Sequence, residues 1–288
     1  MPLRKSAKSL QSHISLFYMV FIVGMMINQA ALAENYPTLS AAQEQWLGQQ
    51  IFNNECAMQV NCLTAWNLGE DFPSLGLGHF IWYKKDQKEI FEESFPALIK
   101  YFEEQNISIP AWLKDSNYNA PWQSRDEFLA DFSGTELSEL RSLLADTFPQ
   151  QTSFIIQRFN AALNRMVAVL PENETSNIEE KFFSVANSHP PYGMYALIDY
   201  VNFKGEGVSS NERYIDQGWG LLQVLTTMPT SSENTLENFI SSAKTVLQNR
   251  VRNAPEQRNE EQWLRGWFNR LDTYLPNRLE PGSTPSTL

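Results

Sequence analysis

Cysteine, histidine and net positive charge are scarce in this chain. Its 288 residues include two cysteines and three histidines, and 22 lysines and arginines stand against 33 aspartates and glutamates. So few possible ligands, with no cysteine and histidine cluster at ligand spacing, argue against a zinc centre. A net charge of −11 disfavours nucleic acid and anionic membranes as partners, since both usually need a basic patch. We therefore expect no metal, no cofactor and no nucleic-acid partner.

Internal repeats, coiled-coil heptads and low-complexity linkers are missing as well. The length suits one large domain or two small ones, and a hydrophobic content of 42% is enough for a core. We predict a single globular domain over residues 34–275. Prolines, serines and threonines gather in residues 276–288, which predicts a disordered tail.

The N-terminus carries an apolar run. Three basic residues precede residues 14–27, which form an apolar segment that is short for a membrane span, and Ala-Leu-Ala at residues 31–33 offers a cleavage site. This pattern predicts a signal peptide over residues 1–33 and a periplasmic or secreted protein without stable membrane insertion after cleavage. An uncleaved anchor is the alternative. Without these residues the chain has 19 lysines and arginines against 33 acidic residues, a net charge of −14.

The two cysteines, Cys56 and Cys62, have five residues between them. In an exported chain, an even pair at this spacing predicts a disulfide that pins the loop after Glu55. Two free thiols, or a metal pair without its further ligands, are the other interpretations.

Most of the remaining chain has helical periodicity. Ser40 with Gln43 forms a capping box, which predicts a helix that ends near Glu55. A strand-like segment covers residues 75–83. The predicted fold class is therefore mainly α (α+β), with a small β-hairpin region near residues 70–83. Further helices are predicted where Ser133 pairs with Glu136, where Ser176 pairs with Glu179, at residues 154–170, and along apolar stripes at residues 236–251 and 263–274.

The segment around Glu55 contains the pattern that suggests a function. After Glu55 come Gly69-Glu70-Asp71 and then Ser74-Leu75-Gly76-Leu77-Gly78-His79. This order resembles the active-site region of phage-type lysozymes, members of the lysozyme-like superfamily. Those proteins place a catalytic Glu at the end of the first helix, an Asp in a hairpin and then a Thr-x-Gly-x-Gly-His turn. The resemblance implies a lysozyme-like helical domain in which Glu55 is the general acid, Glu70 or Asp71 is the second carboxylate, and Ser74 positions water.

A second segment, residues 214–225, is similar to the Gly-Leu-Met-Gln turn of lytic transglycosylases and to the Gly-Arg-Gly-x-x-Gln turn of plant-type chitinases. In those relatives a catalytic Glu precedes the turn, and here Glu206 is the upstream acid. The resemblance implies that Glu206 is a competing catalytic candidate and that Tyr214 and Gln223 grip the substrate. We expect Glu55 and Glu206 to line one cleft.

Burial and aromatic neighbours are the remaining expected features of the site. Burial against residues such as Phe52 would raise the pKa of Glu55, so that it holds a proton near neutral pH. His79 is expected to order the turn together with Ser74. The candidate sugar-stacking rings are Trp66, Trp82, Tyr214 and Trp219.

These features predict an exported glycosidase that cleaves a β-1,4-linked amino-sugar polymer, with peptidoglycan as the expected polysaccharide partner. Hydrolysis uses a second carboxylate, whereas a transglycosylase uses the substrate's own hydroxyl, so both reactions remain open. A chitinase-like enzyme differs only in substrate. An inactive binding or scaffold protein on the same fold is the rival interpretation, in which Glu55 only pairs or caps at a helix end.

Overall fold

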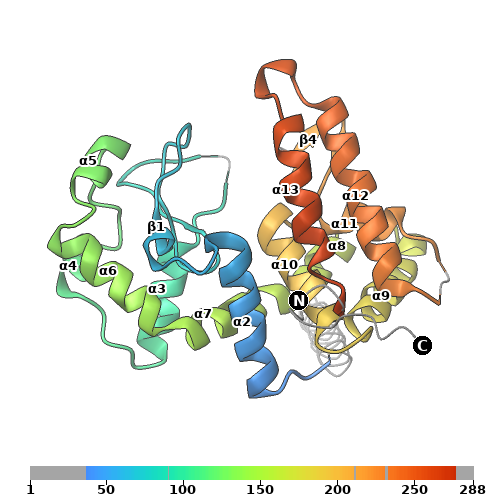
Figure 1. The fold of residues 1–288 in the computed structure, drawn as a ribbon, viewed down its shortest axis with the longest axis horizontal. Helices are drawn as coiled ribbons and strands as arrows, with labels where there is room; N and C mark the ends of the chain where they lie inside the picture. Colours follow the sequence, from blue (N-terminus) through green and yellow to red (C-terminus); the bar gives the residue numbers. More distant parts are fainter. Residues whose placement is uncertain (1–36, 90, 211, 231–232, 277–288) are drawn as a thin grey trace, which may run out of the picture. The chain divides into compact units, whose positions relative to one another are not determined.

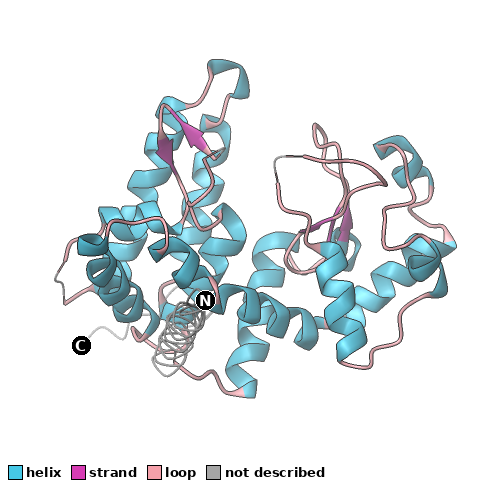
Figure 2. Cartoon of the chain, turned by 180° about the vertical axis from the view of Figure 1, so that it is seen from behind, coloured by secondary structure: helices cyan, strands magenta, loops and turns pink. Residues whose placement is uncertain are grey.

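The computed structural model describes residues 37–89, 91–210, 212–230 and 233–276 (Figure 1). The predicted signal peptide and residues 277–288 of the predicted tail lie outside the described residues. By its contacts the chain divides into Met1–Thr38 and Leu39–Leu288, and all elements below belong to the second unit. Helices hold 60% of the described residues and strands 5%, in small antiparallel sheets, which confirms the mainly α fold class (Figure 2).

The bounds of the elements are as follows. The helices are α2 (Ala41–Cys56), α3 (Phe95–Glu104), α4 (Ala111–Asp115), α5 (Arg125–Ala130), α6 (Thr135–Asp146), α7 (Phe148–Asn160), α8 (Ala162–Val167), α9 (Glu172–Ala186), α10 (Tyr192–Lys204), α11 (Leu221–Thr227), α12 (Thr235–Asn253) and α13 (Glu261–Asp272), with 3-10 turns η1 (Val60–Leu63) and η2 (Glu256–Arg258). The strands are β1 (Thr64–Ala65), β2 (Ser74–Leu75), β3 (Phe80–Ile81), β4 (Arg213–Tyr214) and β5 (Gln217–Gly218).

Helix α2 begins at the predicted capping box. The Ser40 hydroxyl accepts a hydrogen bond from the Gln43 backbone nitrogen at 3.3 Å, and the Gln43 side chain accepts one from the Ser40 nitrogen at 2.9 Å. These two bonds satisfy donors that a helix start leaves free. The helix ends at Cys56, where Ala57 takes a left-handed conformation. Glu55 therefore lies in the last turn, as predicted.

The predicted hairpin region is a three-stranded antiparallel sheet in the order β1-β2-β3. The turn between β2 and β3 is held by α7, because the Leu77 backbone nitrogen donates to the buried Gln151 side chain at 2.9 Å. Gly76 has φ +69°, and a Cβ there would lie 2.4 Å from Gln151 Oε1. Only glycine combines that backbone conformation with such a close approach.

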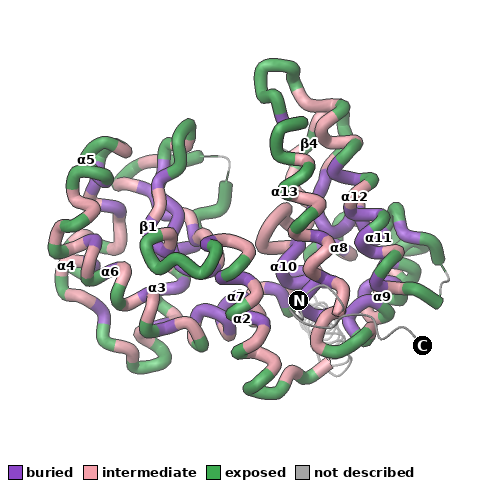
Figure 3. The backbone as a smooth tube through the Cα atoms, viewed as in Figure 1, coloured by how far each residue is buried: buried purple, intermediate pink, exposed green. Residues whose placement is uncertain are grey.

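Helix α10 lies at the centre of the second unit and contacts α7, α9 and α11. Every residue from Gly193 to Tyr200 is buried, so the helix is covered on all sides (Figure 3). Its sequence has no amphipathic stripe, which is why periodicity did not predict it. Most of the apolar stripe of α12 is buried, whereas in α13 only Leu271 is buried and Trp263 is 42% exposed.

Two predicted helix starts are wrong. Helix α6 begins after Gly134, without a side-chain cap from Ser133. Helix α9 begins four residues before Ser176, where Pro171 precedes two glutamates in the first turn. Proline at a helix start costs no hydrogen bond, and acidic side chains there complement the helix dipole. Among the described residues no helix is both long and apolar enough to cross a membrane.

Candidate active site

A cavity of about 580 Å³ brings together the main segments that the sequence singles out. Its lining comes from the end of α2, the three-stranded sheet, the end of α10, the β4–β5 hairpin, and helices α12 and α13. Ligand pockets in proteins commonly have volumes of about 300–1,000 Å³. The predicted site residues that line it are Glu55, Glu70, Ser74, His79, Tyr214 and Trp219.

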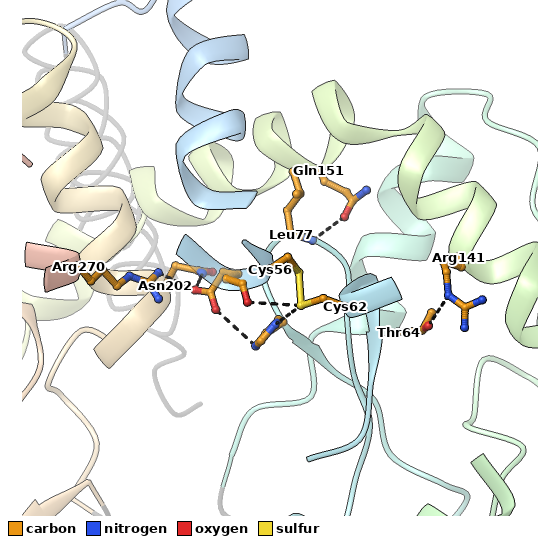
Figure 4. The surroundings of a disulfide bond; sticks show 10 residues. Cys56, Cys62, Thr64, Leu77, Arg141, Gln151, Asn202 and Arg270 are labelled. Carbon is orange, nitrogen blue, oxygen red and sulfur yellow. Dashed lines mark hydrogen bonds and ion pairs between the residues drawn. A yellow bond between two sulfur atoms is a disulfide. The ribbon is translucent and has the colours of Figure 1, made fainter. Parts of the chain in front are cut away.

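Glu55 is held by three side chains within this cavity. Its Oε1 accepts hydrogen bonds from Arg270 Nη2 at 2.6 Å and Asn202 Nδ2 at 3.1 Å. Its Oε2 lies 3.5 Å from His79 Nδ1. Figure 4 shows Arg270 and Asn202 on one side of this site and the Cys56–Cys62 bridge on the other. The carboxylate is therefore fixed by cationic and amide donors.

The disulfide between Cys56 and Cys62 is present, as predicted (Figure 4). Cys62 Sγ lies 3.4 Å from the Glu55 backbone oxygen and 3.9 Å from His79 Nε2. The two sulfur atoms and a His79 nitrogen lie close enough together to bind one metal ion, but both sulfur atoms form the disulfide bond. The bridge thus links the end of α2 to the 3-10 turn η1, which directly precedes β1.

Arg270 connects Glu55 to a buried network that the sequence did not predict. Its guanidinium also donates to both oxygens of Asp199, each at 2.8 Å, and the Tyr274 hydroxyl donates to the same carboxylate at 2.7 Å. Asp199 is fully buried. A charge so deep in a protein needs a partner of this kind. An aspartate within the apolar segment of α10 was the one signal that could have revealed it.

The expected rise in the pKa of Glu55 is wrong. Burial pushes the pKa of Glu55 upward, but the charges of Arg270 and His79 and the hydrogen bonds from Arg270 and Asn202 together outweigh it, and the net shift is downward. The cause is long-range, because Arg270 lies 215 residues further along the chain. In this state Glu55 is ionised at neutral pH.

The structure separates the two candidates for the second carboxylate. Glu70 lines the cavity with Glu55, and burial raises its pKa despite a hydrogen bond from Asn67 at 3.1 Å and the charge of His79. Asp71 is exposed and lines a different pocket with Lys84. Only Glu70 shares the hollow with Glu55.

Ser74 presents an unusual hydroxyl. The residue is 4% exposed and lines the cavity, yet within the described residues its Oγ has no hydrogen-bond partner. Buried polar atoms are nearly always hydrogen-bonded to protein or water, so an exception calls for a ligand or a water. His79, at the end of the same motif, has φ +45° and completes the turn between β2, which contains Ser74, and β3.

Glu206 lies in a smaller, adjoining cavity of about 210 Å³. Its carboxylate accepts two hydrogen bonds from Arg165 Nε, at 2.8 and 3.0 Å, and pairs with Arg165 Nη2. The two cavities share lining residues, among them His79 and Asn202. Glu55 and Glu206 are thus near a common boundary but do not face the same hollow.

The Gln223 side chain connects the loop at Gly207 to the start of α11 at Gly220 by hydrogen bonds. Its side chain accepts from the Gly220 nitrogen at 2.9 Å and donates to the Gly207 oxygen at 3.0 Å. A Cβ on Gly220 would lie 2.1 Å from the Gly207 nitrogen, so this crossing requires glycine. Both ends of the Gln223 amide thus bond to the backbone, and Gln223 is not among the residues that line the cavity of Glu55, so its contact with substrate stays a prediction.

The aromatic candidates divide into two groups. Tyr214 and Trp219 line the cavity, with ring centroids 4.8 Å apart. Trp66 lines the pocket of Asp71, and its indole donates to the Glu70 backbone oxygen at 2.8 Å. The prediction that Trp82 binds sugar is wrong, because Trp82 is fully buried among core aromatic rings.

No protein-family model, curated protein or solved structure matches this chain.

Proposed function

We propose that this protein is an exported glycoside-cleaving enzyme that acts on a β-1,4-linked amino-sugar polymer, with peptidoglycan as its substrate. The observation that carries the proposal is the shared cavity in which Glu55, Glu70 and Ser74 meet the rings of Tyr214 and Trp219. Carboxylates provide acid and base chemistry for glycosidic bonds, and rings provide the stacking faces that sugars need. These residues come from the two segments that resemble lysozyme-like enzymes.

Glu55 is the catalytic acid in this proposal, and its contact with Arg270 controls whether the Glu55 carboxyl is protonated. Burial is the largest single influence on the pKa of Glu55, and Arg270 provides the largest opposing one. Arg270 also donates to Asp199 at 2.8 Å, so the Arg270 side chain stays in place when Glu55 moves away from it. When Glu55 turns from Arg270 to the glycosidic oxygen, loss of the contact with Arg270 raises its pKa, so the carboxylate takes up a proton from solvent and then donates it to that oxygen.

Ser74 and Glu70 favour hydrolysis over transglycosylation. The Ser74 hydroxyl has a free hydrogen-bonding capacity inside the cavity, which suits a water molecule. Glu70 lies in the same cavity, and burial raises its pKa, which makes its ionised form a stronger base toward an attacking water. A transglycosylase needs neither group, because the substrate's own hydroxyl attacks.

The pairing of Glu55 favours one second candidate, an inactive binding protein on the same framework. A carboxylate that is ionised and held by Arg270 at 2.6 Å is also a normal structural ion pair. On this account the cavity binds a glycan without cleaving it, and Glu55 only joins α2 to α13.

Digestion of purified sacculi by the oxidised protein separates these accounts. Mass spectrometry of the released fragments should find muropeptides with reducing ends, which indicate hydrolysis. Anhydro ends would instead assign a transglycosylase. Binding to sacculi without any released fragment would refute cleavage and leave the binding protein. Protein treated with a thiol reductant serves as a matched sample, because it lacks the bridge beside Glu55.

A further inference from the structure

The cavity that holds Glu55 has an uneven distribution of charge. Its lining between residues 201 and 270 contributes four cations, Lys204, Arg250, Arg258 and Arg270, and one carboxylate, Glu212. Its lining between residues 67 and 92 contributes two carboxylates and no lysine or arginine. The cations that line the cavity are therefore gathered on one part of its wall.

Three of the four cations already have carboxylate partners. Arg250 donates twice to Glu260, at 2.7 and 2.8 Å, and Arg258 donates to the same group at 3.2 Å. Arg270 is shared between Asp199 and Glu55. Arg250 and Arg270 therefore have little capacity left for an anionic ligand, whereas Arg258 donates to Glu260 through Nε alone and its side chain is 54% exposed.

Lys204 differs from the arginines because no carboxylate of the described residues forms an ion pair with it. Its ammonium lies 3.9 Å from the centroid of the Phe203 ring and 3.7 Å from that of Trp267. Two aromatic faces stabilise a cation only in part, whereas a carboxylate would complete its hydrogen bonding. Burial, together with the charges of Arg250 and Arg270, holds the pKa of Lys204 well below its usual range, although Glu260 and Glu55 act in the opposite direction.

We propose that Lys204 is the binding group for a carboxylate of the substrate, so that the cavity selects an acidic glycan over a neutral one. This inference rests on the proposed glycan-cleaving function and adds a specificity residue to it. An approaching carboxylate stabilises the charged form of Lys204 and forms an ion pair with the ammonium beside the two rings. Glu70 and Glu92, in the other part of the lining, repel the same carboxylate and thereby fix the direction in which the chain lies.

The carboxylate that Lys204 binds has two possible sources on a wall polymer. It belongs either to the sugar itself or to a peptide attached to the sugar.

The test measures the affinity of the protein for defined oligomers by calorimetry, with Glu55→Gln in every variant so that no turnover occurs. The oligomers are peptide-free wall strands with free sugar carboxylates, the same strands with those carboxylates amidated, strands that keep their peptides, and neutral chitohexaose.

Free sugar carboxylates should raise the affinity about tenfold over the amidated strands, as one charge-assisted hydrogen bond does. Lys204→Met should remove this preference, and Lys204→Arg should retain most of it. A preference confined to peptide-bearing strands, and lost in Lys204→Met, assigns the peptide as the source. Lys100→Met, at an exposed position of α3, is the matched control and should keep the preference.

A preference for free carboxylates that survives in Lys204→Met, or its absence from the parent protein, would overturn the assignment. Thermal unfolding of each variant checks that the fold is intact, and Lys204→Gln replaces Lys204→Met if the latter does not fold. The two proposals fail separately. If binding depends on the carboxylate but the chain with native Glu55 releases no fragments from sacculi, cleavage alone is refuted. If fragments are released but binding shows no preference for the carboxylate, the role of Lys204 alone is refuted.

Discussion

Arg270 Nη2 lies 2.6 Å from Glu55 Oε1, and this contact joins two residues that are 215 positions apart. It explains why the pKa of Glu55 is lowered although the carboxyl is buried. It also ties the last turn of α2 to α13. The state of this ion pair therefore decides both the stability of the site and the chemistry that Glu55 can perform.

Removal of the Arg270 charge should be costly. Arg270→Met leaves the fully buried Asp199 carboxylate without its guanidinium, and loss of one partner of a buried pair costs about 3–5 kcal/mol. Urea unfolding at neutral pH measures this loss. Arg265→Met, at an exposed position of the same helix, should change the free energy of unfolding by about 0.5 kcal/mol or less. Equal effects of the two substitutions would contradict the importance of the network.

The lowered pKa of Glu55 should make stability depend on pH in one direction. A carboxyl whose folded pKa is below its ordinary 4.5 stabilises the fold above that value, and this contribution is lost as the pH falls through the folded pKa. Wild type should therefore exceed Glu55→Gln in free energy of unfolding at pH 7, and the difference should shrink below about pH 4.5. A difference that grows as the solution is acidified would mean that the folded pKa is raised.

Ser74→Ala should separate activity from stability. Because the Ser74 hydroxyl is buried without a protein partner, its removal should cost less than about 0.5 kcal/mol. If it orders the attacking water, hydrolysis should fall at least about tenfold. Ser94 is the matched control, since its buried hydroxyl accepts a hydrogen bond from the Ile81 nitrogen at 3.1 Å. Ser94→Ala should cost about 1 kcal/mol with turnover largely kept, and the reverse pattern would refute the role of Ser74.

Loss of the disulfide should affect the site more than the whole molecule. A bridge over so short a loop contributes about 2 kcal/mol by the chain-entropy model. The paired substitution Cys56→Ser with Cys62→Ser should lower the free energy of unfolding by this amount, and glycan cleavage should fall further than stability alone explains, because Cys56 directly follows Glu55. Full activity in the doubly substituted protein would show that the bridge has no positional role.

The predictions from sequence that the structure confirms rest on local interactions. The capping box at Ser40, the position of Glu55 at the end of α2 and the Cys56–Cys62 bridge each involve residues close in sequence. A local pattern gave the wrong helix start at α9. This helix begins after Pro171, with acidic residues in its first turn, and not at the predicted Ser176.

The rest could not be predicted because it depends on packing between distant segments. The burial of α10 on all sides removes the periodicity that identifies a surface helix. The arginine partners of Glu55 and Glu206 come from α13 and α8, and nothing near either glutamate in the sequence indicates these two arginines. For the same reason, burial alone gave the wrong direction for the pKa of Glu55, since the opposing charge of Arg270 lies far away in the chain.

The most direct test of the central claim compares Glu55→Gln with Glu206→Gln in the release of fragments from sacculi. Both substitutions keep the side-chain volume and remove one carboxylate that an arginine holds, so they are matched. If Glu55 is the catalytic acid, Glu55→Gln should lower the rate at least about 100-fold, whereas Glu206→Gln should stay within about tenfold of wild type. Undiminished release by Glu55→Gln, or a selective loss in Glu206→Gln, would contradict the account.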